Sequence, residues 1–342
     1  MAKKNAHHIK YNFFVSKEGD AKNALGKEGL LKVMKEMLTI RHFEMRAESA
    51  YQQGKVGGFF HAYMGQEAIQ TAAIHAMGVE NNWWVTTYRC HALAFLCGAT
   101  PNEMMAELYG KVTGNAMGRG GSMHLYADRM LGGFGIVGGH LPIATGAAFS
   151  LKYQKQTGIA ICFLGEGAFV QGAVHESLNL ASLWNLPCVY VIENNQWGMG
   201  TAVSRALCVQ PIAEHFAPAY GMKSYTLDGM DFNNCYSGFK QIHDEVKKTG
   251  RPVLVEVVTE RFRGHSISDP GLYRSKEELE AAKGRDPIHL FRDYLIKEKI
   301  LTEKEFEACD QEIKEKIIAS MKYAESSPEP DVMTLEEDVF AP

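Results

Sequence analysis

The sequence predicts an α/β protein in which a parallel sheet is flanked by helices and followed by a helical C-terminal tail. Residues 159–164, 188–193 and 252–258 form short apolar runs that are typical of strands buried on both faces. One helical segment and short loops separate the first two runs, which is the arrangement of a parallel βαβ unit. The chain has 342 residues, of which 46% are hydrophobic, so it can bury a large core.

The N-terminal part of the chain combines one amphipathic helix with a glycine-rich region. Residues 27–53 are expected to be helical because apolar side chains recur at helical spacing, at Leu30, Met34, Met37 and Leu38. Gly54 stands where a C-terminal cap would end this helix. About half of the 33 glycines then lie between Gly54 and Gly146. This region is therefore expected to contain many turns and sites of close backbone approach.

The clearest supersecondary unit follows the glycine-rich region. A strand at 159–164 precedes a helix at Ala173–Leu183 and a second strand at 188–193. Short connections imply a right-handed crossover, so both strands end at the same edge of the sheet. Cys162 and Cys188 lie within these strands and are expected to be core thiols. The seven cysteines contain no CxxC pair, which argues against a zinc ribbon or a dithiol redox site and favours a reducing compartment.

Residues after Ser275 are charged and predict amphipathic helices. Two start signals are present, Asp286 before Pro287 and Thr302 with Glu305 in capping-box spacing. Apolar residues follow the second signal on one helix face, at Phe306, Ile313 and Ile317. We therefore expect an N-terminal arm, an α/β domain and a helical C-terminal region that packs on the same domain, at residues 1–26, 27–275 and 276–342.

Composition excludes several classes of partner. The net charge of −4 gives no field that would attract nucleic acid or an anionic membrane surface. No run of 18 apolar residues is present, so no membrane span is expected. Residues 1–14 lack the apolar stretch of a secretory signal and the composition of a transit peptide. A cytoplasmic protein without a targeting segment is the expectation.

A glutamate between two glycines marks the end of the strand at 159–164. Gly165 and Gly167 allow the main chain to approach a ligand, and the following helix N-terminus favours an anion. The Glu166 carboxylate would repel a phosphate unless a divalent cation lay between them. Mg²⁺ takes hard oxygen ligands, commonly one or two protein groups together with phosphate and water.

The next strand supplies the other ligands. It ends in Asn194 and Asn195, and Asn195 follows Glu166 by 29 residues, one βαβ crossover. Because adjacent parallel strands lie ~4.8 Å apart, the two side chains could bracket one ion. The turn that follows could add the main-chain carbonyl of Trp197. The pattern predicts a metal–diphosphate site.

These motifs have two other interpretations. A glycine pair after a strand and an Asn-Asn pair can each form an ordinary turn. A dinucleotide-binding site would need a third glycine at position 170, which is Val170, and no P-loop is present. The metal–diphosphate site is preferred because both halves occur together at the separation of one crossover.

The chain resembles the E1 α family of the thiamine diphosphate-dependent 2-oxo acid dehydrogenases, and within it the members that act on pyruvate. The family motif is GDG, about thirty residues, then NN, and residues 165–195 match it apart from Glu166. Other matching segments cover most of the chain: "GFFHAYMGQEA", "TTYRCH", "GRGGSMH", "GGFGIVGG", "NNQWGMGT" and "RFRGHSISDPGLYRS". The resemblance implies the thiamine diphosphate-binding fold for the α/β domain.

The resemblance also implies how the cofactor is held. Tyr88 and Arg89 would contact thiamine diphosphate, with the arginine on the diphosphate, although from the residues alone Arg89 reads as a surface arginine beside a partly buried tyrosine. The main chain at Gly135 and Val137 would hold the aminopyrimidine ring. Mg²⁺ would be bound by Glu166, Asn195 and the Trp197 carbonyl, and the diphosphate would be lined by Gly165, Gly167 and Ala168.

Two histidines are implied as catalytic. His61 matches a histidine near the reacting carbon of the cofactor, although a core histidine is the alternative. His265 matches a loop histidine that reaches the cofactor, with Arg261, Arg263 and Arg274 in the same loop. A histidine titrates near neutral pH, so both are expected to handle protons or stabilise charge. Some family members are phosphorylated at the serine that matches Ser266, where added charge would compete with the diphosphate.

The implied reaction is decarboxylation of pyruvate followed by transfer of the acyl unit to a lipoyl group of the E2 component. The chain offers no glutamate for the pyrimidine ring, which in the family comes from a β chain, so an α2β2 assembly that is inactive without β is expected. Acetoin or a branched-chain 2-oxo acid is the alternative substrate. Glu166 replaces the usual aspartate and moves the carboxylate by ~1.5 Å, so a non-catalytic subunit with an impaired metal site is a further alternative.

Overall fold

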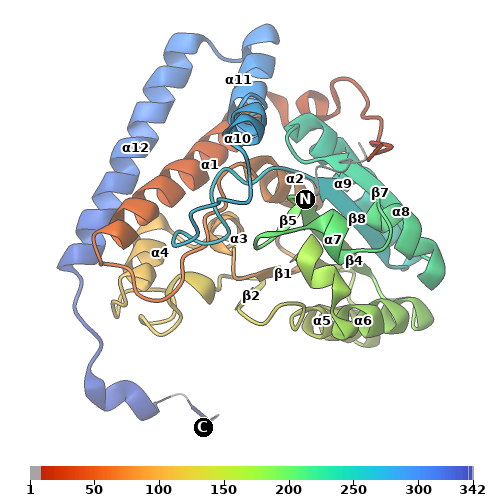
Figure 1. The fold of residues 1–342 in the computed structure, drawn as a ribbon, viewed down its shortest axis with the longest axis horizontal. Helices are drawn as coiled ribbons and strands as arrows, with labels where there is room; N and C mark the ends of the chain where they lie inside the picture. Colours follow the sequence, from red (N-terminus) through yellow and green to blue (C-terminus); the bar gives the residue numbers. More distant parts are fainter. Residues whose placement is uncertain (1–8, 338, 341–342) are drawn as a thin grey trace.

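The computed structural model describes residues 9–337 and 339–340, and its centre is a six-stranded parallel sheet (Figure 1). The strand order is β2-β1-β3-β4-β8-β7. The strands, in that order, are Met130–Phe134, Trp83–Thr87, Ala160–Gly165, Cys188–Asn194, Val253–Val258 and Lys223–Asp228. The predicted parallel sheet is confirmed, and all three predicted strands belong to it. A separate antiparallel pair, β5 and β6, comprises Trp197–Gly198 and Thr201–Ala202.

Side chains of the central strands alternate between two hydrophobic cores, one on each face of the sheet. On β3, Ile161 and Phe163 face one core, whereas Cys162 and Leu164 face the other. Helices of the second core cover one face of the sheet: α5 (Leu141–Tyr153), α6 (Gly172–Leu183) and α8 (Ile212–Phe216). Helices of the first core cover the opposite face: α1 (Asp20–Gln52), α2 (Glu67–Met77) and α9 (Phe232–Thr249). Figure 1 shows α5 and α6 together below the sheet.

Helix α1 begins earlier than the sequence pattern predicts. It runs from Asp20 to Gln52, and the backbone breaks at Gly26, whose φ of 64° is left-handed. The amphipathic pattern therefore detects only the part beyond this break, where Leu30, Met34, Met37 and Leu38 are buried as expected. Gly54 follows the helix with a φ of 73°, the conformation expected of a terminating glycine.

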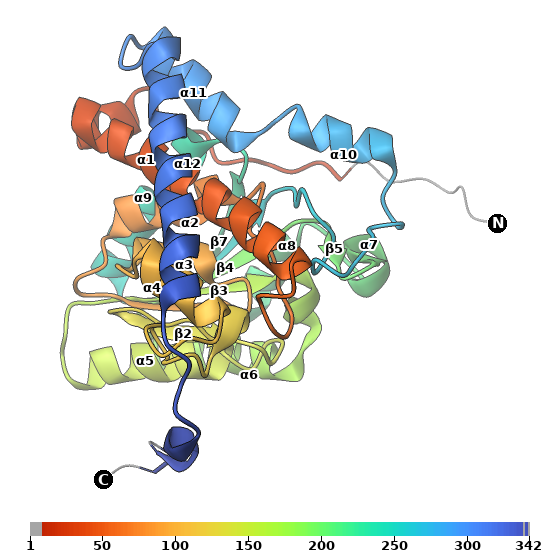
Figure 2. The same ribbon diagram turned by 90° about the vertical axis from the view of Figure 1, so that its left-hand side faces the viewer.

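Two of the C-terminal helices, α11 and α12, pack against α1. Helices α10 (Lys276–Lys283), α11 (Pro287–Lys297) and α12 (Glu303–Ser326) begin at capping side chains of Ser275, Asp286 and Thr302. The predicted capping box of Thr302 and Glu305 is confirmed. Helix α12 lies along α1 and α4, and the chain after it leads away from the body of the molecule (Figure 2). The proposed division of the chain at residues 26 and 275 stays a prediction.

Short elements complete the described part of the chain. They are α3 (His91–Leu96), α4 (Pro101–Leu108), α7 (Val203–Ala206) and four 3₁₀ segments, Gly121–Met123, Glu166–Val170, Ala217–Tyr220 and Val332–Glu336. Within residues 9–337 and 339–340, no helix combines the length and apolar character that crossing a membrane requires.

Candidate active site

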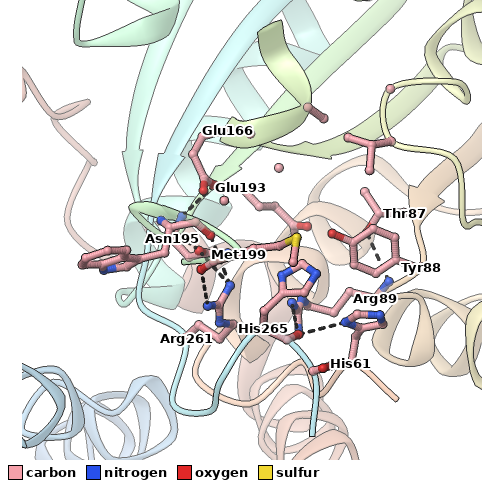
Figure 3. A pocket seen from close by; sticks show the side chains of 18 of the residues that line it. His61, Thr87, Tyr88, Arg89, Glu166, Glu193, Asn195, Met199, Arg261 and His265 are labelled. Carbon is pink, nitrogen blue, oxygen red and sulfur yellow. Dashed lines mark hydrogen bonds between the residues drawn. The ribbon is translucent and has the colours of Figure 1, made fainter. Parts of the chain in front are cut away.

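A cavity of about 590 Å³ opens at the carboxyl edge of the sheet, where strands β1, β3, β4 and β8 end (Figure 3). Its walls come from the turns that follow these four strands and from two loops, at residues 59–66 and 134–140. Ligands of open α/β sheets bind at this edge because the loops there converge and helix N-termini point toward it. Charged, amide and imidazole side chains converge in the cavity among apolar residues and glycines.

The turn after β3 carries a buried carboxylate. Glu166 is only 2% exposed and begins a 3₁₀ segment, so six residues separate the end of β3 from the start of α6. Its Oε2 accepts a hydrogen bond from the Asn195 main-chain N–H at 3.3 Å. No Lys, Arg or His of the described chain lies within ion-pair distance of it. Burial raises the pKa of Glu166, because the charged form lacks solvent and a direct counter-ion.

The turn after β4 faces the turn that carries Glu166. Register pairs Gly165 of β3 with Glu193 of β4, so Glu166 and Asn195 extend from neighbouring strand ends. Gly167 and Gly198 face each other so closely that a Cβ built on Gly167 would lie 3.2 Å from the Gly198 Cα. The Asn195 Oδ1 and the Trp197 carbonyl both accept from Arg261 Nη1, at 3.4 Å and 3.2 Å. The two turns thus bring together one carboxylate, one amide oxygen and one main-chain carbonyl.

Arg89 is a buried cation at the opposite wall. It follows β1, is 6% exposed, and donates to the carbonyls of Ala62 at 2.5 Å and His265 at 3.1 Å. Burial lowers its pKa, and the charge of Arg261 adds to this effect. No carboxylate of the described residues pairs with Arg89 within ion-pair distance. The interpretation of Arg89 as a surface arginine is therefore wrong, because the loops at 62 and 265 cover it.

His61, Tyr88 and His265 form an aromatic cluster beside Arg89. The ring centroids of His61 lie 4.4 Å from Tyr88 and 4.8 Å from His265. His61 Nδ1 donates to the His265 carbonyl at 2.9 Å, so Nε2 is the free nitrogen of the neutral ring. Burial and the charge of Arg89 lower the pKa of His61 to about 4 and that of His265 to about 3. The expectation that both titrate near neutral pH is wrong for this state of the site, and both rings are neutral at pH 7.

Comparisons with known proteins agree with the geometry. Residues 35–333 match the family model described as "Dehydrogenase E1 component". The chain is 42% identical to the pyruvate dehydrogenase E1 component subunit alpha of Rickettsia felis over 92% of this chain and 96% of that protein.

The chain belongs to the dehydrogenase E1 component family.

Similar relatives extend beyond Rickettsia. The protein of the same name from Rhizobium meliloti is 38% identical over 92% of this chain and 90% of its own length. The mitochondrial type II subunit alpha of the same enzyme from Ascaris suum is 38% identical and is covered over 80% of its length. The resemblance stated from the sequence motifs is confirmed.

The cavity of this E1 component brings together every site residue that the sequence analysis names. The cavity lining includes His61, Tyr88, Arg89, Gly135, Val137, Gly165, Glu166, Gly167, Ala168, Asn195, Trp197 and His265. They come from six separate segments of the chain. His61 is 6% exposed, yet it faces the cavity and not the hydrophobic core. Their individual roles toward a cofactor stay predictions.

Sequence reasoning missed several lining residues of this E1 component. Gln66 is 1% exposed and donates nothing through its Nε2, while its Oε1 accepts from Asn195 Nδ2 at 3.3 Å. Glu193 is bound by the Tyr63 hydroxyl and by Gln70 Nε2, and burial raises its pKa to about 7. Phe59, Gln66 and Met199 lie in or beside the quoted family segments, and Glu193 directly precedes Asn194. These motifs were the available signal, but they do not tell which neighbours face the cavity.

Proposed function

We propose that this chain is the α subunit of a pyruvate dehydrogenase E1 component that works with a β subunit. The pair would decarboxylate pyruvate and pass the acyl unit to a lipoyl group of an E2 component. One observation carries the proposal: a buried carboxylate and a buried arginine, both without an ion-pair partner among the described residues, surround one cavity together with an amide oxygen and a main-chain carbonyl. The names of the relatives support pyruvate as the substrate.

The cavity fits magnesium. Glu166, Asn195 and the Trp197 carbonyl supply three hard oxygens from two adjacent turns. In the described part of the chain no three His, Cys, Asp or Glu side chains cluster as an all-protein metal site. That donor set suits Mg²⁺, which keeps water and phosphate among its ligands. A bound dication would also relieve the burial of the Glu166 charge, which has no ion-pair partner in the described residues.

The cavity also fits thiamine diphosphate. The glycines at 165 and 167 leave the main chain open beside the metal ligands, and nothing lies within 4 Å of a Cβ built on Gly165. Gln66 Nε2 is a buried donor without a partner, which a bound ligand can satisfy. Arg89 offers a desolvated guanidinium that would hold the diphosphate, and Gly135 and Val137 would hold the pyrimidine.

When bound, the thiazolium ring of thiamine diphosphate supplies the electron sink that decarboxylation of a 2-oxo acid requires. The residues of this chain orient the reactants and control protons. The neutral His61 ring keeps its Nε2 as an acceptor, because its Nδ1 donates to the His265 carbonyl. The two imidazoles would accept or donate hydrogen bonds at the substrate oxygens without adding positive charge. Arg261 would attract the substrate carboxylate.

The rim of the cavity supports a partner subunit. Phe59, Ile136 and Met199 line the cavity and are 64%, 76% and 63% exposed. Large apolar side chains gathered around a polar cleft indicate burial by another protein. We assign this rim to the β subunit of an α2β2 assembly, which would complete the pyrimidine side of the site. A cytoplasmic location and phosphorylation at Ser266 stay predictions.

Coexpression with the β subunit tests the proposal. The assembly should release CO2 from pyruvate only when Mg²⁺ and thiamine diphosphate are present, and faster than from branched-chain 2-oxo acids. The chain alone should show no turnover. Glu166→Ala should abolish Mg²⁺-dependent cofactor binding measured by calorimetry, while Glu166→Asp should retain it.

Three results would contradict parts of the proposal. Faster turnover of a branched-chain 2-oxo acid, or NAD⁺-linked acetoin cleavage without pyruvate turnover, would change the substrate. Turnover by the chain alone would remove the need for β. Absence of cofactor binding by the wild-type assembly would leave a non-catalytic subunit.

A further inference from the structure

We propose that Tyr11, in the N-terminal arm, is a positioning residue of the metal site. It would hold the turn that carries Asn195 and Trp197 without touching the ion. This inference rests on the proposed metal–diphosphate site and adds a segment far away in the sequence to it.

The turn after β4 adopts a conformation that needs support. Gln196 has a φ of 69° and Met199 a φ of 55°, and side chains other than glycine rarely adopt such left-handed angles. The Gln196 main-chain N–H donates to Asn194 Oδ1 at 3.0 Å, and the Trp197 N–H donates to Asn195 Oδ1 at 3.3 Å. The positions of the two metal-ligand oxygens therefore depend on how firmly Asn194 and Gln196 are held.

Tyr11 contacts both of these residues. Its hydroxyl oxygen accepts from Gln196 Nε2 at 3.2 Å and from Asn194 Nδ2 at 3.5 Å, across more than half of the chain length. Asn194 Nδ2 also donates to Glu256 Oε1 on β8 at 2.7 Å, so the sheet supports Asn194 as well. For the side-chain amide of Gln196, the described residues provide Tyr11 as the hydrogen-bond partner. Tyr11 thus holds the turn mainly through its hydrogen bond with the Gln196 side chain.

The arm itself is anchored to the sheet. The Phe14 main-chain N–H donates to the Thr226 carbonyl of β7 at 2.8 Å. The Phe14 carbonyl accepts from Asn234 Nδ2 of α9 at 2.8 Å. These two bonds fix the arm three residues beyond Tyr11, which allows its hydroxyl to act as a fixed support.

Arg261 holds the turn from the cavity side in a different way. Its guanidinium bonds Asn195 Oδ1 and the Trp197 carbonyl, which are the same oxygens that the ion would take. Metal binding therefore competes with Arg261 for these acceptors. The bonds of Tyr11 involve neither oxygen and can persist when the metal is bound. The arm would then support the loaded turn.

The test measures metal affinity directly. The α/β assembly, saturated with thiamine diphosphate, is titrated with Mn²⁺ as a probe, and free Mn²⁺ is counted by electron paramagnetic resonance. Tyr11→Phe removes one hydroxyl and should weaken Mn²⁺ binding about 3- to 10-fold, because this is the change in affinity that corresponds to the loss of one hydrogen bond. The melting temperature of the metal-free assembly should fall less than that of the Mn²⁺-loaded assembly. Val15→Ala, in the same arm but 86% exposed, should bind Mn²⁺ like the wild type.

A double variant checks the route of the effect. If Tyr11 acts through Gln196, then Tyr11→Phe combined with Gln196→Ala should bind Mn²⁺ no more weakly than Gln196→Ala alone. Three results would each overturn the inference: wild-type affinity in Tyr11→Phe, additive losses in the double variant, or an equal drop in the melting temperature of the metal-free and the Mn²⁺-loaded assembly. Absence of Mn²⁺ binding in the wild type would instead overturn the proposed metal site, and this inference with it.

Discussion

Two buried clusters of charge in this E1 component differ in one respect, which is whether their charges are paired. Between α1, α2 and α11, Arg41 bonds Glu67 at 2.6 Å and Asp286 at 2.7 Å. Burial alone would lower the pKa of Arg41, but these two carboxylates outweigh it and raise the pKa. In the cavity, Arg89 and Glu166 are more deeply buried than Arg41, yet neither has an ion-pair partner within the described residues.

The difference separates structural from functional charge. A paired buried cluster is satisfied by the fold itself, so it contributes to the packing of three helices. An unpaired buried charge costs stability unless a ligand supplies the missing counter-charge. In the proposed function, the diphosphate and Mg²⁺ would supply the counter-charges that Arg89 and Glu166 lack among the described residues, so the empty cavity is expected to cost the fold stability.

The largest effect should come from breaking the paired cluster. Glu67→Ala removes one partner of Arg41 and should lower the free energy of unfolding by about 3–5 kcal/mol, because it leaves a buried cation poorly paired. The matched variant Glu166→Ala removes an unpaired carboxylate and should change the free energy of unfolding by less than about 1 kcal/mol. Urea denaturation of the purified chain measures both. Equal losses would show that pairing does not distinguish the two clusters.

The next effect concerns the unpaired arginine. Arg89→Met should weaken binding of thiamine diphosphate by about 10- to 100-fold, because a hydrogen bond to a charged group is lost in a site that excludes water. Calorimetry of the assembly with Mg²⁺ at saturation measures the affinity. Arg251→Met alters an exposed arginine and serves as the control. An unchanged affinity in Arg89→Met would assign the anion to another residue.

The smallest effect for a single residue is the loss of stability that His61 or His265 should cause at low pH. The pKa values of His61 and His265, about 4 and about 3, lie below the value of ~6.5 in an unfolded chain. Between these limits the unfolded chain binds more protons, so stability falls as the pH falls, and the loss is complete below the folded pKa values. From pH 7 to pH 5 each histidine should cost about 1–2 kcal/mol.

Denaturation at both pH values, on the wild type and on His61→Asn with His265→Asn, isolates this contribution. The double variant should lose less stability on acidification than the wild type. If both proteins lose the same amount, the two rings are protonated as readily as in the unfolded chain, and the charge of Arg89 does not reach them.

The sheet and the edge at which Glu166 and Asn195 meet could be predicted because their signals are local. The strand of Ala160–Gly165, the crossover helix and the pair Asn194 and Asn195 follow one another within one βαβ unit, and parallel strands place their ends at one edge. The roles of Tyr88 and Arg89 came from the family resemblance, since a tyrosine and an arginine after a strand have no distinctive spacing.

What could not be predicted depends on contacts between distant segments. Arg89 is buried because loops at residues 62 and 265 cover it, and the low pKa values of the histidines follow from their own burial and from the charge of Arg89. The link from Tyr11 to Gln196 spans residues with no shared motif. The start of α1 at Asp20 could not be predicted because Gly26 interrupts the amphipathic pattern.

The contact between Gly167 and Gly198 has a consequence for how this site can change over evolution. The two turns meet main chain against main chain, so their separation is not adjustable through a choice of rotamer. The longer side chain of Glu166, the proposed metal ligand, can adjust by its own torsions, whereas a methyl group at either glycine would force the two main chains apart. We therefore expect substitution by aspartate to be tolerated at Glu166, but no substitution to be tolerated at Gly167 or Gly198.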